Sequence, residues 1–122
     1  MTRETVLANV PTGILIDGEW REGSGGGRVS VDDPATGLEL ATVADATAAD
    51  ATAALDAAVA AQRGWAATPP RVRGEILRRA FELVASRSDE FASLMSLEMG
   101  KTVKEAKGEV AYGIDFFRWY SE

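Results

Sequence analysis

The sequence predicts an α/β fold in which short β-strands are followed by four helices. Apolar and polar residues alternate with a period of two in residues 28–32 and 38–43, as they do in half-buried strands. Asp17 and Gly18 separate two short apolar stretches, and this pair favours a type I′ hairpin turn, in which both central residues have positive φ. From Thr47 onward, apolar residues recur with helical spacing.

Residues 1–13 show neither period, and we expect them to form a flexible N-terminal arm. The hairpin is expected over residues 14–21, with Trp20 opposite the two isoleucines of the first strand. A glycine-rich segment, residues 23–27, comes next. A phosphate-binding loop would follow a buried strand and open a helix, and this segment does neither, so we interpret it as a flexible loop between strands.

The first two predicted helices lie between residues 47 and 87. The first begins at Thr47 and is expected to end at Gly64, with Trp65 as a core anchor just beyond it. The second begins at residues 68–70, where Thr68 is the predicted cap and proline suits the first turn. Its predicted buried face comprises Ile76, Leu77, Ala80, Phe81, Leu83 and Val84. The arginines between residues 71 and 79 indicate a solvated or salt-bridged face rather than a nucleic-acid patch.

The third predicted helix begins at Ser88, with acidic residues in its first turn. Glu98 falls on the same helical face as Phe91 and Leu94, so its carboxylate needs a partner. We favour a buried ion pair with a nearby basic residue over a catalytic acid, because one carboxylate without a second group has no mechanism.

A tight elbow is predicted between the third and fourth helices. Gly100 is expected to end one helix, and Thr102 with Glu105 to open the next through a capping box. The Gly-Lys-Thr sequence here could be mistaken for the end of a phosphate-binding loop. That motif needs a glycine where this chain has Met95, and a strand leading in, so we reject nucleotide binding at the elbow.

The last predicted helix, residues 103–122, carries two apolar stripes. One comprises Val103, Ala106, Val110, Ile114 and Phe117, and the other Tyr112, Phe116, Trp119 and Tyr120. A helix that is apolar nearly all round is typically covered on every side. We therefore expect this surface to be covered by further sequence or by another subunit, and we expect the chain to be part of a longer protein.

The composition excludes several classes of function. A net charge of −6 argues against nucleic acid and anionic membranes as partners. The chain has no histidine and no cysteine, which excludes a disulfide framework, a thiolate nucleophile and a zinc site of the usual ligands. No apolar run is long enough to span a bilayer, and the N-terminus lacks a signal-peptide pattern, so a cytoplasmic location is expected.

Several segments in order resemble the N-terminal part of the aldehyde dehydrogenase superfamily. They are Leu-Ile-Asp-Gly-Glu-Trp at 15–20, Asp-Pro-Ala-Thr-Gly at 33–37, Leu-Glu-Met-Gly-Lys at 97–101, Glu-Ala-Lys-Gly-Glu-Val at 105–110 and Phe-Phe-Arg-Trp-Tyr-Ser-Glu at 116–122. The last two look most like NAD(P)-dependent succinate-semialdehyde dehydrogenases. The resemblance implies that residues 14–122 are the front of a Rossmann-like coenzyme-binding domain in a homo-oligomeric enzyme about four times this length.

The resemblance implies an enzyme in which a cysteine thiolate attacks a small aldehyde and hydride passes to NAD or NADP. A glutamate of such an enzyme then activates water. This chain has no cysteine, so we assign no catalytic, cofactor-binding or metal-binding residue to it. Some family members bind a monovalent cation in regions where this chain has Asp32 and Glu109, and we leave these two unassigned. A stand-alone helical interaction module remains the alternative function.

Overall fold

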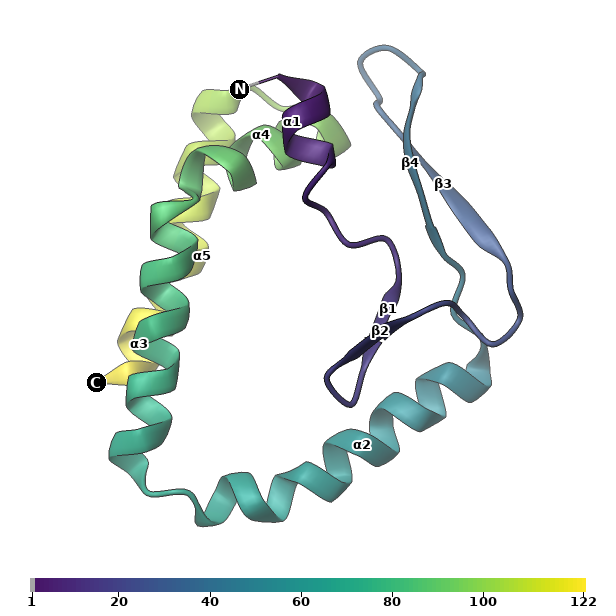
Figure 1. The fold of residues 1–122 in the computed structure, drawn as a ribbon. Helices are drawn as coiled ribbons and strands as arrows, with labels where there is room; N and C mark the ends of the chain where they lie inside the picture. Colours follow the sequence, from purple (N-terminus) through teal and green to yellow (C-terminus); the bar gives the residue numbers. More distant parts are fainter. Residues whose placement is uncertain (1) are drawn as a thin grey trace.

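The computed structural model describes residues 2–122, which form an open ring around a central gap (Figure 1). Within these residues the chain forms five helices and two hairpins. The elements are α1 (Arg3–Leu7), β1 (Ile14–Ile16), β2 (Glu19–Arg21), β3 (Arg28–Asp32), β4 (Glu39–Ala44), α2 (Ala48–Ala67), α3 (Pro70–Ser86), α4 (Ser88–Met99) and α5 (Val103–Ser121). The predicted order, strands before the long helices, is confirmed.

The four strands form two separate antiparallel hairpins, β1 with β2 and β3 with β4. Asp17 and Gly18 have φ angles of 53° and 80°, which confirms the predicted turn with two positive φ values. Trp20, however, lies opposite Leu15. The prediction that it faces the isoleucines is wrong, because the two-residue turn sets the register and thereby pairs Ile14 with Arg21.

The N-terminal segment includes a short helix, α1, which the sequence pattern did not predict in the arm over residues 1–13. Thr2 caps α1 by accepting a hydrogen bond from the Thr5 N–H. Val6 is buried, and α1 packs against α4. A five-residue helix is too short to show a period in the sequence or to be stable alone, so this tertiary contact accounts for it.

Helix α2 is longer than predicted. It continues through Gly64 and Trp65 to Ala67, and Trp65 is 45% exposed, so neither the predicted end nor the predicted core anchor is correct. Glycine within a helix costs only about 1 kcal/mol, which need not end it. Thr68 closes α2 by donating from its hydroxyl to the Gly64 carbonyl, and Pro69 rather than Thr68 is the N-cap of α3.

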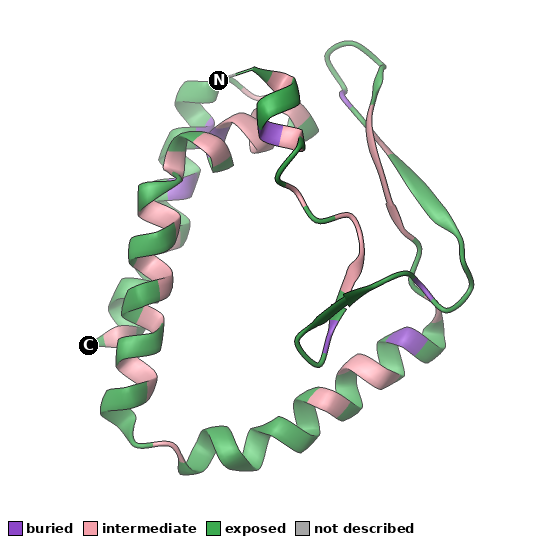
Figure 2. Cartoon of the chain, in the orientation of Figure 1, coloured by how far each residue is buried: buried purple, intermediate pink, exposed green. Residues whose placement is uncertain are grey.

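The buried core is small and lies where α4 and α5 cross. It consists of Ala92, Ala106 and Val110, against which Val84, Met95 and Ile114 pack. Both alanines are fully buried. Because their side chains are small, the two helix backbones can approach closely. Helix α3 contacts α5 along much of its length. Figure 2 shows how few residues are buried elsewhere in the ring.

Two predicted buried faces are only partly buried. On α3, Leu77, Ala80, Phe81 and Val84 are half-buried, whereas Ile76 and Leu83 are more than half exposed. Glu98 is also exposed and forms no ion pair within residues 2–122, so the prediction of a buried ion pair there is wrong. The core contacts of α4 involve Ala92 and Met95, and Glu98 lies beyond them in the last turn.

Candidate functional site

The elbow between α4 and α5 forms as the sequence predicts. Gly100 ends α4 with a φ of 73°. The Thr102 hydroxyl accepts a 3.3 Å hydrogen bond from the Glu105 N–H, and Oε2 of Glu105 accepts a 3.2 Å hydrogen bond from the Thr102 N–H. Hydrogen bonds from the Thr102 hydroxyl and backbone lower the pKa of Glu105. A helix leads into the Gly-Lys-Thr segment, as predicted, whereas a phosphate-binding loop follows a strand.

The elbow also contacts the turn between β3 and β4. A side chain on Gly100 would place its Cβ 3.2 Å from Cγ of Pro34, so the two turns are in close contact. Arg3 donates from its guanidinium to the Glu39 carbonyl, which ties the N-terminal residues to the same hairpin. These contacts connect the β3–β4 hairpin to the helical part of the ring.

The two acidic residues left unassigned in the sequence have separate partners. Asp32 accepts a 2.7 Å hydrogen bond from the Ser30 hydroxyl, and Glu109 forms an ion pair with Lys101. Residues 2–122 contain no group of three or more acidic, histidine or cysteine side chains arranged to hold a metal. The structure therefore gives no reason to assign Asp32 or Glu109 to a metal site within these residues.

The glycine-rich loop between β2 and β3 is anchored on the first turn of α2. Asp50 is buried, with 6% of its surface exposed, and its Oδ2 accepts hydrogen bonds from the Ser24 N–H at 3.0 Å and the Thr47 N–H at 2.8 Å. Backbone hydrogen bonds from Thr47 and then Ser24 lower the pKa of Asp50 to about 2. The loop lies between two strands, as predicted, and its glycines do not lead into a helix.

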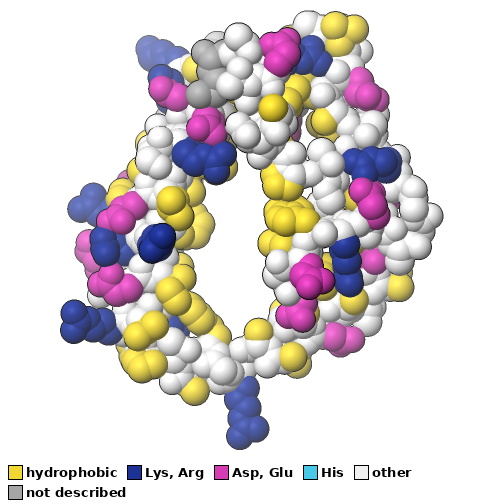
Figure 3. Space-filling view, viewed as in Figure 1, with side chains coloured by type: hydrophobic (Ala, Val, Ile, Leu, Met, Phe, Trp, Pro, Cys, Tyr) yellow, Lys and Arg dark blue, Asp and Glu magenta, His cyan; other side chains and the backbone are white. Residues whose placement is uncertain are grey.

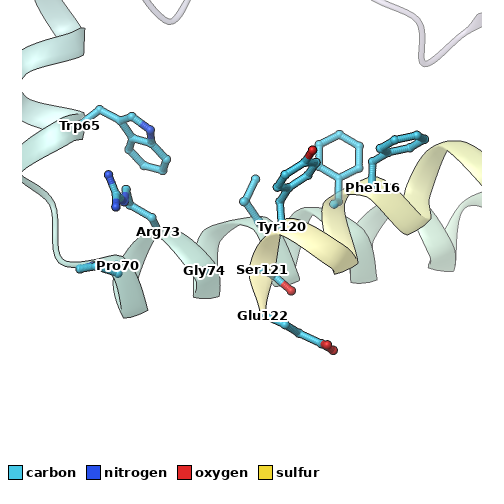
Figure 4. A pocket seen from close by; sticks show the side chains of 10 residues that line it. Trp65, Pro70, Arg73, Gly74, Phe116, Tyr120, Ser121 and Glu122 are labelled. Carbon is cyan, nitrogen blue, oxygen red and sulfur yellow. The ribbon is translucent and has the colours of Figure 1, made fainter.

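A large concave surface lies between α3 and the end of α5 (Figure 4). We call it the aromatic cleft, and define it by Trp65, Pro70, Arg73, Gly74, Leu77, Phe116, Phe117, Tyr120, Ser121 and Glu122. Trp65 and Arg73 stand at one end and the α5 aromatic side chains at the other. Figure 3 shows hydrophobic side chains gathered along the inner wall of the ring as well. Such apolar surface is typical of regions that contact other protein.

The sequence predicts the aromatic wall of the cleft on α5 but not the participation of Trp65 and Arg73. The α5 aromatic side chains are exposed, so residues 2–122 do not themselves cover the apolar surface that the sequence predicts on the last helix. The sequence predicts Trp65 in the core and Arg73 on a solvated or salt-bridged face, because it does not show that the end of α2 and the end of α5 line one cleft. One feature of the sequence could have indicated a special role for Arg73, because arginines occupy the first turn of α3 and no acidic residue does.

Comparison with known proteins identifies the family. Residues 20–122 match the aldehyde dehydrogenase family. A succinate-semialdehyde dehydrogenase of Paenarthrobacter nicotinovorans is 68% identical over 83 residues, which cover 68% of this chain and 18% of the relative. The succinate-semialdehyde dehydrogenase [NADP(+)] of Escherichia coli is 41% identical over 108 residues, covering 88% of this chain and 22% of the relative. The chain therefore belongs to the aldehyde dehydrogenase family.

A solved structure supports the same assignment. The betaine aldehyde dehydrogenase of Staphylococcus aureus, solved as a point mutant in complex with NAD+, superposes with a TM-score of 0.91. It is 26% identical, and the match covers 99% of this chain and 24% of that chain. The chain thus spans about a fifth of the length of the relatives it matches.

No helix within residues 2–122 is long and apolar enough to cross a membrane.

Proposed function

We propose that this chain is the N-terminal segment of an enzyme that oxidises succinate semialdehyde to the carboxylic acid with NAD or NADP. Residues 14–122 would form the front of its coenzyme-binding domain. The observation that carries the proposal is the 68% identity to a succinate-semialdehyde dehydrogenase. The proposal further includes a cytoplasmic, homo-oligomeric enzyme without nucleic-acid or membrane partners, in line with the net charge of −6.

The described residues serve this function as a scaffold. The chain has no cysteine, so the thiolate chemistry implied by the family must come from elsewhere in the enzyme. The glycine-rich loop leads into β3, and the Gly-Lys-Thr elbow follows α4. Neither geometry fits a dinucleotide phosphate, so we derive no cofactor contact and no chemical step from residues 2–122.

The function is tested with a chimeric enzyme. The part of the Paenarthrobacter nicotinovorans relative that aligns with this chain is replaced by this chain, and reduced nicotinamide is measured with succinate semialdehyde and with either coenzyme. We expect the chimera to be active and to prefer succinate semialdehyde over short uncharged aldehydes. A matched chimera carrying Ala106→Arg should be inactive, because it buries an unpaired charge in the core.

The second test measures aldehyde oxidation by the isolated chain. We expect no turnover above that of a boiled control, because the thiol nucleophile is absent. An inactive chimera that expresses as well as the relative would argue against the segment assignment. Activity of the isolated chain would contradict the proposal that the catalytic residues lie elsewhere in the enzyme.

A further inference from the structure

Arg73 is a half-buried cation for which residues 2–122 provide no side-chain hydrogen bond or ion pair. The acids nearest to it along α3 are already engaged, because Arg78 forms ion pairs with both Glu75 and Glu82. Removing a guanidinium partly from water without a partner is unfavourable. Residues 2–122 therefore provide no counter-charge for the Arg73 guanidinium.

The position of Arg73 within α3 does not explain its charge. It lies at the N-terminal end of the helix, which begins at Pro70 and has no acidic residue in its first turn. The partial positive charge at a helix N-terminus disfavours cations there. A residue that breaks a local rule without local compensation points to a role outside its own helix.

The surroundings of Arg73 combine this cation with apolar walls. In Figure 4 its side chain lies near Trp65, and Phe116 and Tyr120 project from α5 on the other side. A Cβ on Gly74 would stand 2.6 Å from the Ser121 carbonyl oxygen, so α5 lies directly against α3 beneath the cleft. Such a cleft fits a polypeptide segment with one large apolar side chain and one carboxylate.

We propose that the aromatic cleft receives a segment from the remaining chain of the enzyme, and that Arg73 pairs with a carboxylate on that segment. This inference rests on the proposed function, because the part matched here is only 18% and 22% of the length of the two relatives. Burial of the cleft aromatics and a charge-assisted hydrogen bond to Arg73 would then hold the two parts together.

The test measures the accessibility of Arg73 in the chimeric enzyme and in the isolated chain. Both are treated with an arginine-selective dicarbonyl reagent, and modification of each arginine is followed by mass spectrometry. Arg79 is the matched control, because it lies on the same helix, is exposed and does not line the cleft. We expect Arg73 to react about tenfold more slowly in the chimera than in the isolated chain, and Arg79 to react alike in both.

Substitutions in the chimera provide an independent readout. Arg73→Glu should lower the Tm and the yield of active enzyme, since it places two carboxylates together, and Arg73→Met should have a smaller effect in the same direction. Arg79→Glu should leave both unchanged. Equal labelling of Arg73 in an active chimera would overturn the inference while leaving the proposed function intact.

Two other outcomes also decide the matter. An inactive wild-type chimera would remove the proposed function and this inference with it. The isolated chain is labelled at a dilution at which gel filtration shows a monomer, and protection of Arg73 in that monomer equal to its protection in the chimera would show that no further segment is needed, and would likewise overturn the inference.

Discussion

The Ser24 N–H donates a 3.0 Å hydrogen bond to Oδ2 of Asp50, which lies 26 residues later in the chain. The Ser24 hydroxyl donates to the same oxygen at 3.0 Å. Asp50 also completes the capping box of α2 with Thr47. One carboxylate therefore caps a helix and holds the glycine-rich loop, which joins the two hairpins, against that helix.

The role of Asp50 predicts a stability change at acidic pH. Folding lowers its pKa from 3.8 to about 2, so the folded chain binds this proton less readily than the unfolded chain. The stabilisation is fully present above pH 3.8 and is lost as the pH falls toward 2. We expect Asp50→Asn to lower the Tm at neutral pH and to flatten the dependence of Tm on pH in this window. Asp56→Asn, on an exposed position of α2, is the control.

Thermal melts of the three proteins over this pH range provide the measurement. If Asp50→Asn loses stability with acid as steeply as the wild-type chain, other carboxylates carry the effect. The hydrogen bonds to Asp50 would then contribute little to folding.

Two glycines should respond to alanine in opposite ways. A Cβ on Gly23 would lie 2.1 Å from the Asp45 carbonyl oxygen, so Gly23→Ala must displace backbone and should cost about 1–3 kcal/mol. Gly108 lies within α5 with no atom near its missing Cβ, so Gly108→Ala should stabilise by about 1 kcal/mol. Urea denaturation of the chimeric enzyme measures both. A change of the same sign in the two variants would contradict the packing around Gly23.

Local patterns in the sequence were sufficient to predict the hairpin turn, the capping box at Thr102 and the elbow. Each depends on a few neighbouring residues, such as Asp17 with Gly18 or Thr102 with Glu105, whose chemistry fixes the backbone nearby.

The errors arose where distant contacts decide the outcome. Helix α1 depends on burying Val6 against α4, and the sequence does not show that contact. Trp65 looked like a core residue because it is large and apolar, yet the ring leaves it 45% exposed beside α5. Both cases depend on tertiary placement, which outweighs local propensity.

The close crossing of α4 and α5 predicts strong sensitivity at Ala106. This side chain is fully buried, so Ala106→Leu should destabilise by about 1–3 kcal/mol through overpacking. Ala111→Leu adds the same atoms at an exposed position of α5 and should be nearly neutral. Urea midpoints of both variants of the chimeric enzyme check this. Equal effects at the two positions would show that the crossing is not tightly packed.

The exposed aromatic side chains of α5 predict how the isolated chain behaves in solution. Trp119 is 76% exposed, and Tyr112, Phe116 and Tyr120 are also largely uncovered. Burying each such ring contributes roughly 1.5–3 kcal/mol, so their exposure favours association. We expect the isolated chain to be helical by circular dichroism, to bind a hydrophobic dye and to elute earlier than a monomer on gel filtration.

Two variants assign the association to this surface. Cutting the chain after Gly113 removes the α5 aromatics other than Tyr112 and should reduce both dye binding and association. Trp119→Ser combined with Phe116→Ser should do the same while keeping α5 at full length. Leu83→Ser, an exposed apolar position on α3, controls for general loss of hydrophobic surface. A compact monomer that binds no dye and melts cooperatively would instead favour the stand-alone interaction module, because such a chain would need no further surface to cover these rings.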